Sequence, residues 1–101
     1  MPLVALVEFH IASGRRSDAV ALFDRMLAQT RAFPGAERID WLVDREDECA
    51  WTLYEEWTSS EDEAAYRDFR AGEGAIPELA GVLDRRPTLR RFDAASEPQG
   101  N

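Results

Sequence analysis

A β-strand followed at once by a helix, within the stretch Cys49–Phe69, constrains the fold of this chain more than any other feature. Side chains of a strand alternate between its two faces. One face of the 49–57 strand therefore carries four large residues, namely Trp51, Leu53, Glu55 and Trp57. Ser60 and Glu63 then have the spacing of a capping box, which predicts a helix over 60–71. The strand face and this helix can enclose a pocket between them.

The remaining hydrophobic pattern predicts a single α+β domain over residues 1–93. The predicted strands cover 3–11, 37–44, 49–57 and 88–92, and the predicted helices cover 17–33, 60–71 and 76–83. Ser17 is the expected N-cap of the first helix, and Pro34 ends that helix. The order βαββαβ is that of a ferredoxin-like fold, in which helices cover one face of a four-stranded antiparallel sheet. The polar segment 94–101 is expected to be a disordered tail.

The first strand is apolar on both of its faces, although the helices can cover only one of them. Val4 and Leu6 belong to the face that the helices leave open. A large exposed apolar face is unfavourable unless another surface covers it. We therefore expect a homodimer in which two copies pack through their sheet faces with two-fold symmetry.

Composition argues against several kinds of partner. The net charge of −8 repels nucleic-acid phosphates and anionic lipids, so we expect neither a nucleic acid nor a membrane as a partner. No apolar run reaches the roughly 18 residues of a membrane span, and no signal-peptide pattern opens the chain, which favours a cytoplasmic location. Cys49 is the single cysteine, so neither an intrachain disulfide nor a multi-cysteine metal site is possible. With no glycine-rich phosphate loop either, we expect no metal and no cofactor.

Three motifs within this framework resemble the antibiotic biosynthesis monooxygenase-like family of dimeric α/β-barrel proteins. They are Phe33-Pro34-Gly35 after the first helix, Glu55-x-Trp57 at the end of the third strand, and Tyr66 on the helix that follows. The resemblance implies a cofactor-independent monooxygenase that uses dioxygen to convert a small aromatic substrate, an anthrone, phenol or hydroquinone, into a quinone. The heme-degrading branch resembles this chain least, because it carries an axial histidine where this chain has Tyr66.

The resemblance also implies the residues of the site. Trp57 and Tyr66 match a Trp and a Tyr of the anthrone-oxidising branch, and Arg70 takes the place of an arginine that lies further along the chain there. Trp57 is expected to stack on a planar ring, Tyr66 to hydrogen-bond a substrate oxygen, and Arg70 to stabilise a phenolate. The expected substrate-binding residues are Phe9, Phe23, Leu53, Glu55 and Phe69. The structural alternatives are a core position for Trp57 and a surface ion pair for Arg70.

Two other functions remain open at this point, a non-catalytic dimeric binder of a hydrophobic metabolite and a polyketide cyclase. His10 is the only histidine, and it is expected to make a structural hydrogen bond on the open face of the sheet. The acidic run 61–63 is interpreted as a solvated helix start that the helix dipole favours.

Overall fold

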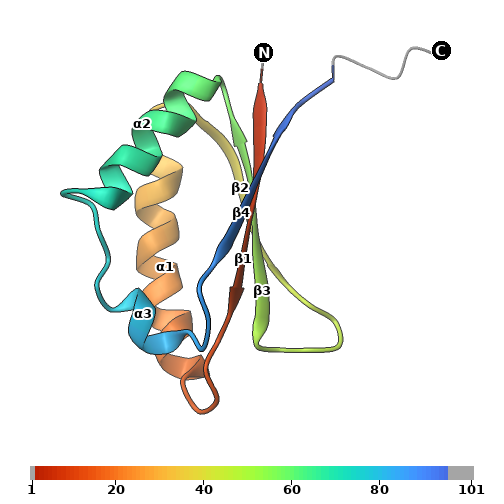
Figure 1. Cartoon of the computed structure of the whole chain (residues 1–101), viewed down its shortest axis with the longest axis vertical. Helices are drawn as coiled ribbons and strands as arrows, with labels where there is room; N and C mark the ends of the chain where they lie inside the picture. Colours follow the sequence, from red (N-terminus) through yellow and green to blue (C-terminus); the bar gives the residue numbers. More distant parts are fainter. Residues whose placement is uncertain (1, 96–101) are drawn as a thin grey trace.

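Four antiparallel strands and three helices make up most of residues 2–95, the part of the chain that the computed structural model describes. Along the chain they are β1 (Leu3–His10), α1 (Arg16–Ala32), β2 (Ala36–Val43), β3 (Ala50–Trp57), α2 (Ser60–Ala71), α3 (Leu79–Val82) and β4 (Thr88–Asp93) (Figure 1). The strand order in the sheet is β2-β3-β1-β4, and every neighbouring pair is antiparallel. This is the ferredoxin-like α+β fold that the sequence predicted.

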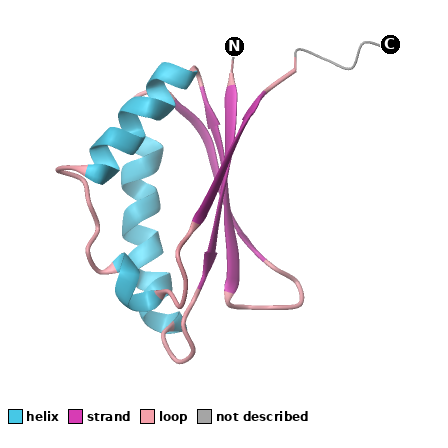
Figure 2. Ribbon diagram, viewed as in Figure 1, coloured by secondary structure: helices cyan, strands magenta, loops and turns pink. Residues whose placement is uncertain are grey.

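The helices lie on one face of the sheet and leave the other face open (Figure 2). Because side chains alternate along a strand, every second residue of β1 and β3 points toward the helices. These buried residues are Leu3, Ala5, Val7 and Phe9 in β1, and Trp51, Leu53, Glu55 and Trp57 in β3. The predicted face of the 49–57 strand is therefore the inner face of the sheet.

Phe23 anchors α1 to the sheet. Its side chain is fully buried, and its ring meets Phe9 at 5.0 Å and Trp51 at 4.8 Å, both edge to face. Such aromatic pairs add about 0.5–1.5 kcal/mol to the stabilisation that burial alone provides. The first helix is thus held at the end of the sheet where β1 finishes.

The Phe33-Pro34-Gly35 turn brings the end of α1 against the start of α2. Gly35 has a φ of +92°, which glycine adopts without the steric cost of a Cβ atom. A Cβ atom at this position would also overlap the side chain of Asp62. The Phe33 ring packs against Tyr66 with 5.3 Å between ring centroids. The motif therefore sets the contact between the two long helices.

Three details of the predicted helices are wrong. The N-cap of α2 is Ser59, not Ser60, and its hydroxyl accepts a hydrogen bond from the Asp62 amide at 3.2 Å. Glu63 is consequently free of any capping role and turns inward, where only 2% of it is exposed. α1 begins at Arg16 without a side-chain cap, so Ser17 is not its N-cap. The short third helix covers Leu79–Val82 rather than 76–83.

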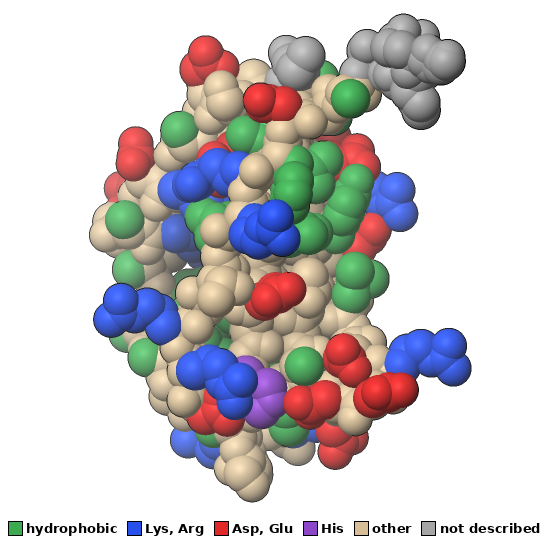
Figure 3. Space-filling view, turned by 45° about the vertical axis from the view of Figure 1, so that its right-hand side comes forward, with side chains coloured by type: hydrophobic (Ala, Val, Ile, Leu, Met, Phe, Trp, Pro, Cys, Tyr) green, Lys and Arg blue, Asp and Glu red, His purple; other side chains and the backbone are tan. Residues whose placement is uncertain are grey.

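The open face of the sheet carries exposed apolar side chains. Leu42 is 48% exposed and Phe92 is 37% exposed, and Val4 and Leu6 beside them are partly buried. Figure 3 brings this side of the molecule forward and shows hydrophobic side chains beside arginines and acidic residues. Within residues 2–95, no helix combines the length and the apolar character that crossing a membrane requires. The prediction of a disordered tail over 94–101 falls mostly on residues 96–101, which lie outside the described part of the chain.

Candidate functional site

A cavity of about 490 Å³ lies between the helices and the inner face of the sheet. Its apolar wall includes Val7, Phe9, Met26, Leu53, Ile76 and Leu89. Its polar lining consists of Glu55, Tyr66, Arg67 and Arg70. A mainly apolar cavity of this size with a few polar groups is typical of a binding site for one small molecule.

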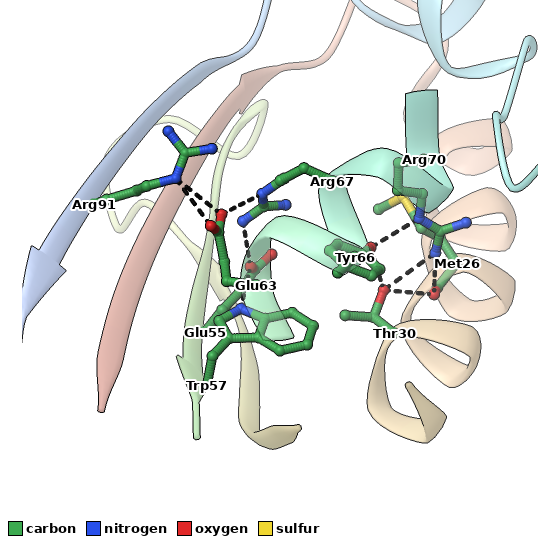
Figure 4. A network of polar contacts seen from close by, with 9 residues as sticks. All are labelled: Met26, Thr30, Glu55, Trp57, Glu63, Tyr66, Arg67, Arg70 and Arg91. Carbon is green, nitrogen blue, oxygen red and sulfur yellow. Dashed lines mark hydrogen bonds and ion pairs between the residues drawn. The ribbon is translucent and has the colours of Figure 1, made fainter. Parts of the chain in front are cut away.

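A chain of ion pairs built on two buried carboxylates forms the first polar part of the site (Figure 4). Glu55 Oε1 accepts a hydrogen bond from Trp57 Nε1 at 3.0 Å and another from Arg67 Nη2 at 2.7 Å. The Nε atom of Arg67 donates to Glu63 at 2.6 Å, and Arg91 of β4 donates to the same carboxylate at 3.0 Å. Two carboxylates and two guanidinium groups therefore alternate, and their charges balance.

The environment of Arg67 keeps it charged. Burial of the guanidinium group acts to lower its pKa, but the carboxylates of Glu55 and Glu63 outweigh this effect, and the pKa of Arg67 is raised. Arg67 therefore keeps its positive charge between the two carboxylates at every physiological pH.

The second polar part of the site surrounds Arg70, whose guanidinium group joins α2 to α1 (Figure 4) and also reaches the backbone of Gly74. It donates to Tyr66 Oη at 2.8 Å, to the backbone oxygens of Met26 and Gly74, and to the side chains of Gln29 and Thr30. These contacts occupy all five of its N–H groups. Among residues 2–95, no carboxylate lies within ion-pair distance of Arg70, so its positive charge is not compensated by a direct partner.

The Tyr66 hydroxyl is already engaged within the protein. It lies 2.7 Å from Thr30 Oγ1, and Thr30 itself donates to the backbone oxygen of Met26. The Tyr66 hydroxyl therefore donates to Thr30 and accepts from Arg70. One lone pair of the phenol oxygen remains for a ligand, so Tyr66 can accept a hydrogen bond from a substrate more readily than it can donate one.

The segment after α2 covers the cavity, and Gly74 fits it closely against Phe69. The Gly74 amide donates to the Phe69 backbone oxygen at 2.8 Å, and its own oxygen accepts from Arg70. A Cβ atom at position 74 would overlap the Phe69 ring. Ala75 and Ile76 then form part of the cavity wall.

The structure brings five of the eight candidate residues to this cavity, namely Phe9, Leu53, Glu55, Tyr66 and Arg70. Trp57 is fully buried behind the Tyr66 ring, with 4.9 Å between ring centroids. Phe23 lies in the core under α1, and Phe69 lines a neighbouring cavity of about 260 Å³. A surface ion pair with Glu73 or Asp62 was the structural alternative for Arg70, and Arg70 makes neither pair among the described residues.

Sequence reasoning missed Glu63, Arg67 and Arg91. The sequence does contain a signal for the pair of Glu63 and Arg67, because residues four apart on a helix are neighbours. Assigning Glu63 to a capping box hid this pair. Arg91 carried no local signal, since it lies 28 positions from Glu63 along the chain.

His10 lies outside this cavity, between two carboxylates at the far end of β1. Its Nδ1 is 2.9 Å from Asp84, and its Nε2 is 3.0 Å from Asp47. Hydrogen bonds to Asp47 and Asp84 raise the pKa of His10, although the nearby Arg85 opposes the shift. The protonated ring, which donates from both nitrogens, therefore ties the β2–β3 loop to the segment before β4.

We expect this tie to make stability depend on pH. The pKa of His10 is raised in the folded state, so its stabilisation is complete below the ordinary value of about 6.5 and is lost as pH rises through the raised value. The free energy of unfolding, measured in urea between about pH 6 and pH 9, should fall more steeply for the native chain than for His10→Gln. Equal slopes for the two proteins would contradict the assignment.

A ferredoxin-like sheet with an apolar cavity under its helices defines a class of small α+β proteins with room for one small ligand. This chain belongs to the antibiotic biosynthesis monooxygenase family, because the sequence model of that family matches residues 2–75. The family resemblance seen in the sequence is thereby confirmed.

Solved structures share this fold. One described as an antibiotic biosynthesis monooxygenase has a TM-score of 0.81 and 18% sequence identity, covering 92% of this chain and 98% of that chain. Rv0793 from Mycobacterium tuberculosis has a TM-score of 0.75 and 21% identity, covering 96% and 98%. A conserved protein from Methanosarcina mazei Go1 has a TM-score of 0.82 and 13% identity, covering 91% of each chain. No curated protein matches significantly. At these identities the likeness establishes the fold alone.

Proposed function

We propose that this protein is a cofactor-independent monooxygenase that oxidises an aromatic anthrone, phenol or hydroquinone to a quinone with dioxygen. The observation that carries the proposal is the cavity of about 490 Å³, which is apolar except for a phenol, two guanidinium groups and a carboxylate. Membership of the family supports the monooxygenase class. A planar aromatic molecule with oxygen substituents suits both parts of this lining, since its rings bury against apolar walls and its oxygens need polar partners.

The reaction balances without an external reductant. An anthrone methylene group and one molecule of dioxygen give the quinone carbonyl group and one molecule of water, and the substrate supplies every electron that dioxygen accepts. The substrate first loses a proton, so that the resulting carbanion or phenolate can transfer electrons to dioxygen. The tasks left to the protein are to orient the substrate, to favour its anionic form and to exclude water.

The residues of the site suit these tasks in different ways. The Arg70 guanidinium has no carboxylate partner among the described residues, so its charge favours an anionic substrate through the cavity even though its N–H groups are occupied. The free lone pair of the Tyr66 oxygen accepts a substrate hydroxyl group. Trp57 supports the Tyr66 ring from behind instead of stacking on the substrate directly.

The active form in this proposal is a homodimer that packs through the open sheet faces. The exposed side chains of Leu42 and Phe92 on that face support it, because burying them against a second copy removes apolar surface from water. Light scattering in dilute solution tests this part of the proposal, and a stable single copy would contradict it.

Oxygen uptake with a panel of anthrones and hydroquinones tests the reaction. We expect uptake and quinone formation in equal amounts for the native chain. Ala75 is exposed and lines the cavity, so Ala75→Trp should fill the site and reduce the rate about a hundredfold. Ala64 is exposed on α2 and does not line the cavity, so the matched control Ala64→Trp should keep the native rate.

The same experiment separates the other two functions. Binding of the aromatic panel without oxygen uptake would contradict the oxygenase and favour a non-catalytic binder. Product formation from a polyketone chain under argon would favour a cyclase. Equal losses in the Ala75 and Ala64 variants would show that the cavity is not the site of reaction.

A further inference from the structure

Two groups in the cavity wall have hydrogen-bonding capacity that the protein does not use. Glu55 is 1% exposed, and both of its hydrogen bonds end on Oε1. Within residues 2–95, Oε2 of Glu55 accepts no hydrogen bond. Arg67 donates from Nε and Nη2 only, so its Nη1 group has no acceptor among the same residues. Both side chains line the cavity.

We infer that Glu55 and Arg67 form a paired acceptor and donor that selects a hydroxylated aromatic ketone, with Glu55 Oε2 accepting from a hydroxyl group that has no internal acceptor and Arg67 Nη1 donating to a ring carbonyl oxygen. The inference rests on the proposed function, since it names the group that orients the substrate in the same cavity. It assigns to Arg67 the direct contact that the sequence suggested for Arg70, whose N–H groups are all occupied.

The charges around the pair exclude other ligands. Glu55 and Glu63 are balanced by Arg67 and Arg91, so the cluster has no net charge with which to attract an ion. A ligand carboxylate at Arg67 would lie beside the Glu55 carboxylate, and a ligand ammonium group at Glu55 would lie beside Arg67. A neutral group that both donates and accepts satisfies the two open positions without either repulsion.

The rigidity of the pair makes it selective. Arg67 is fixed from two sides by Glu55 and Glu63, and Glu63 is fixed in turn by Arg91. Because neither side chain can turn away to find another partner, a ligand without the hydroxyl group leaves the Glu55 oxygen unsatisfied. Sites built to hydrogen-bond a hydroxyl group reject analogues that lack it far more strongly than apolar pockets do.

Quinones that are already oxidised test this inference by binding alone. In fluorescence titrations with 2-hydroxyanthraquinone, 2-methoxyanthraquinone and anthraquinone, we expect the hydroxy compound to bind the native chain at least about tenfold more tightly than the methoxy compound. Glu55→Gln places an amide donor where the ligand needs an acceptor, so the two affinities should become equal to within about twofold. Glu61→Gln makes the same change at an exposed position of α2 outside both the cavity lining and the ion-pair network, and should keep the preference.

Equal affinities in the native chain, a preference retained in Glu55→Gln, or no binding of any of the three compounds would overturn the inference. The affinities of the hydroxy and methoxy compounds for the native chain test the inference even if the Glu55→Gln chain does not fold. Loss of oxygen uptake with the hydroxyl preference intact would contradict the proposed reaction and leave the acceptor–donor pair in place. Oxygen uptake without any preference for the hydroxy compound would contradict the acceptor–donor pair and leave the proposed reaction in place.

Discussion

Arg67→Met is expected to lower the free energy of unfolding by about 3–5 kcal/mol, because it leaves two buried carboxylates without their shared partner. Glu55 and Glu63 are almost fully buried, and Arg67 itself is only 22% exposed, so water cannot replace the lost guanidinium group efficiently. Urea denaturation followed by tryptophan fluorescence measures the change.

The matched control for this prediction is the same substitution at an exposed arginine. Arg38 pairs with Asp40 at 2.8 Å, but its side chain is largely exposed. Arg38→Met should therefore cost less than about 1 kcal/mol, as surface ion pairs do. Similar losses at the two arginines would mean that the buried network contributes no more than a surface pair.

Arg70→Met is expected to have the second largest effect, a loss of about 2–3 kcal/mol, because several partly buried acceptors lose their donor at once. The Arg70 contacts connect α1, through Met26 and Thr30, to α2 and to the Gly74 backbone. Without them, amide hydrogen exchange should speed up in the 72–79 segment, while β1 and β3 keep their protection.

Arg25→Met provides the control for this second prediction. Arg25 is exposed on the same helix that Arg70 contacts, and it makes no side-chain hydrogen bond within residues 2–95. Its replacement should leave both the unfolding free energy and the exchange of 72–79 unchanged. If amide hydrogen exchange in 72–79 were as slow in Arg70→Met as in the native chain, contacts other than those of Arg70 would hold this segment over the cavity.

The parts of this structure that depend on local patterns could be predicted from the sequence. Alternation along 49–57 identified the inner face of β3, and Pro34 placed the end of α1. The positions of Leu53 and Glu55 in the cavity wall follow from the same alternation. Periodicity is a property of neighbouring residues, so a single sequence contains it.

The parts that depend on partners distant in the chain could not be predicted in the same way. Glu63 has two local interpretations, as a capping residue and as the partner of Arg67 four residues on, and only the position of Arg91 on β4, distant in the chain, shows that it is the centre of a network. Arg70 was expected to bind substrate because of the family resemblance, and the sequence could not show that its five acceptors come from α1, α2 and the Gly74 loop, which it does not place together. Such polar networks are set by tertiary packing, which no local spacing encodes.

The close fit of the segment that covers the cavity depends on the absence of a Cβ atom at Gly74. A larger residue at Gly74 would overlap the Phe69 ring, and it would also disturb the backbone oxygen that accepts from Arg70. A substitution at this position would therefore alter both the cover of the cavity, through Ala75 and Ile76, and the hydrogen bonds that hold Arg70 in its lining. In this fold, the size of the molecules admitted and the polar groups that meet them are coupled through a single glycine.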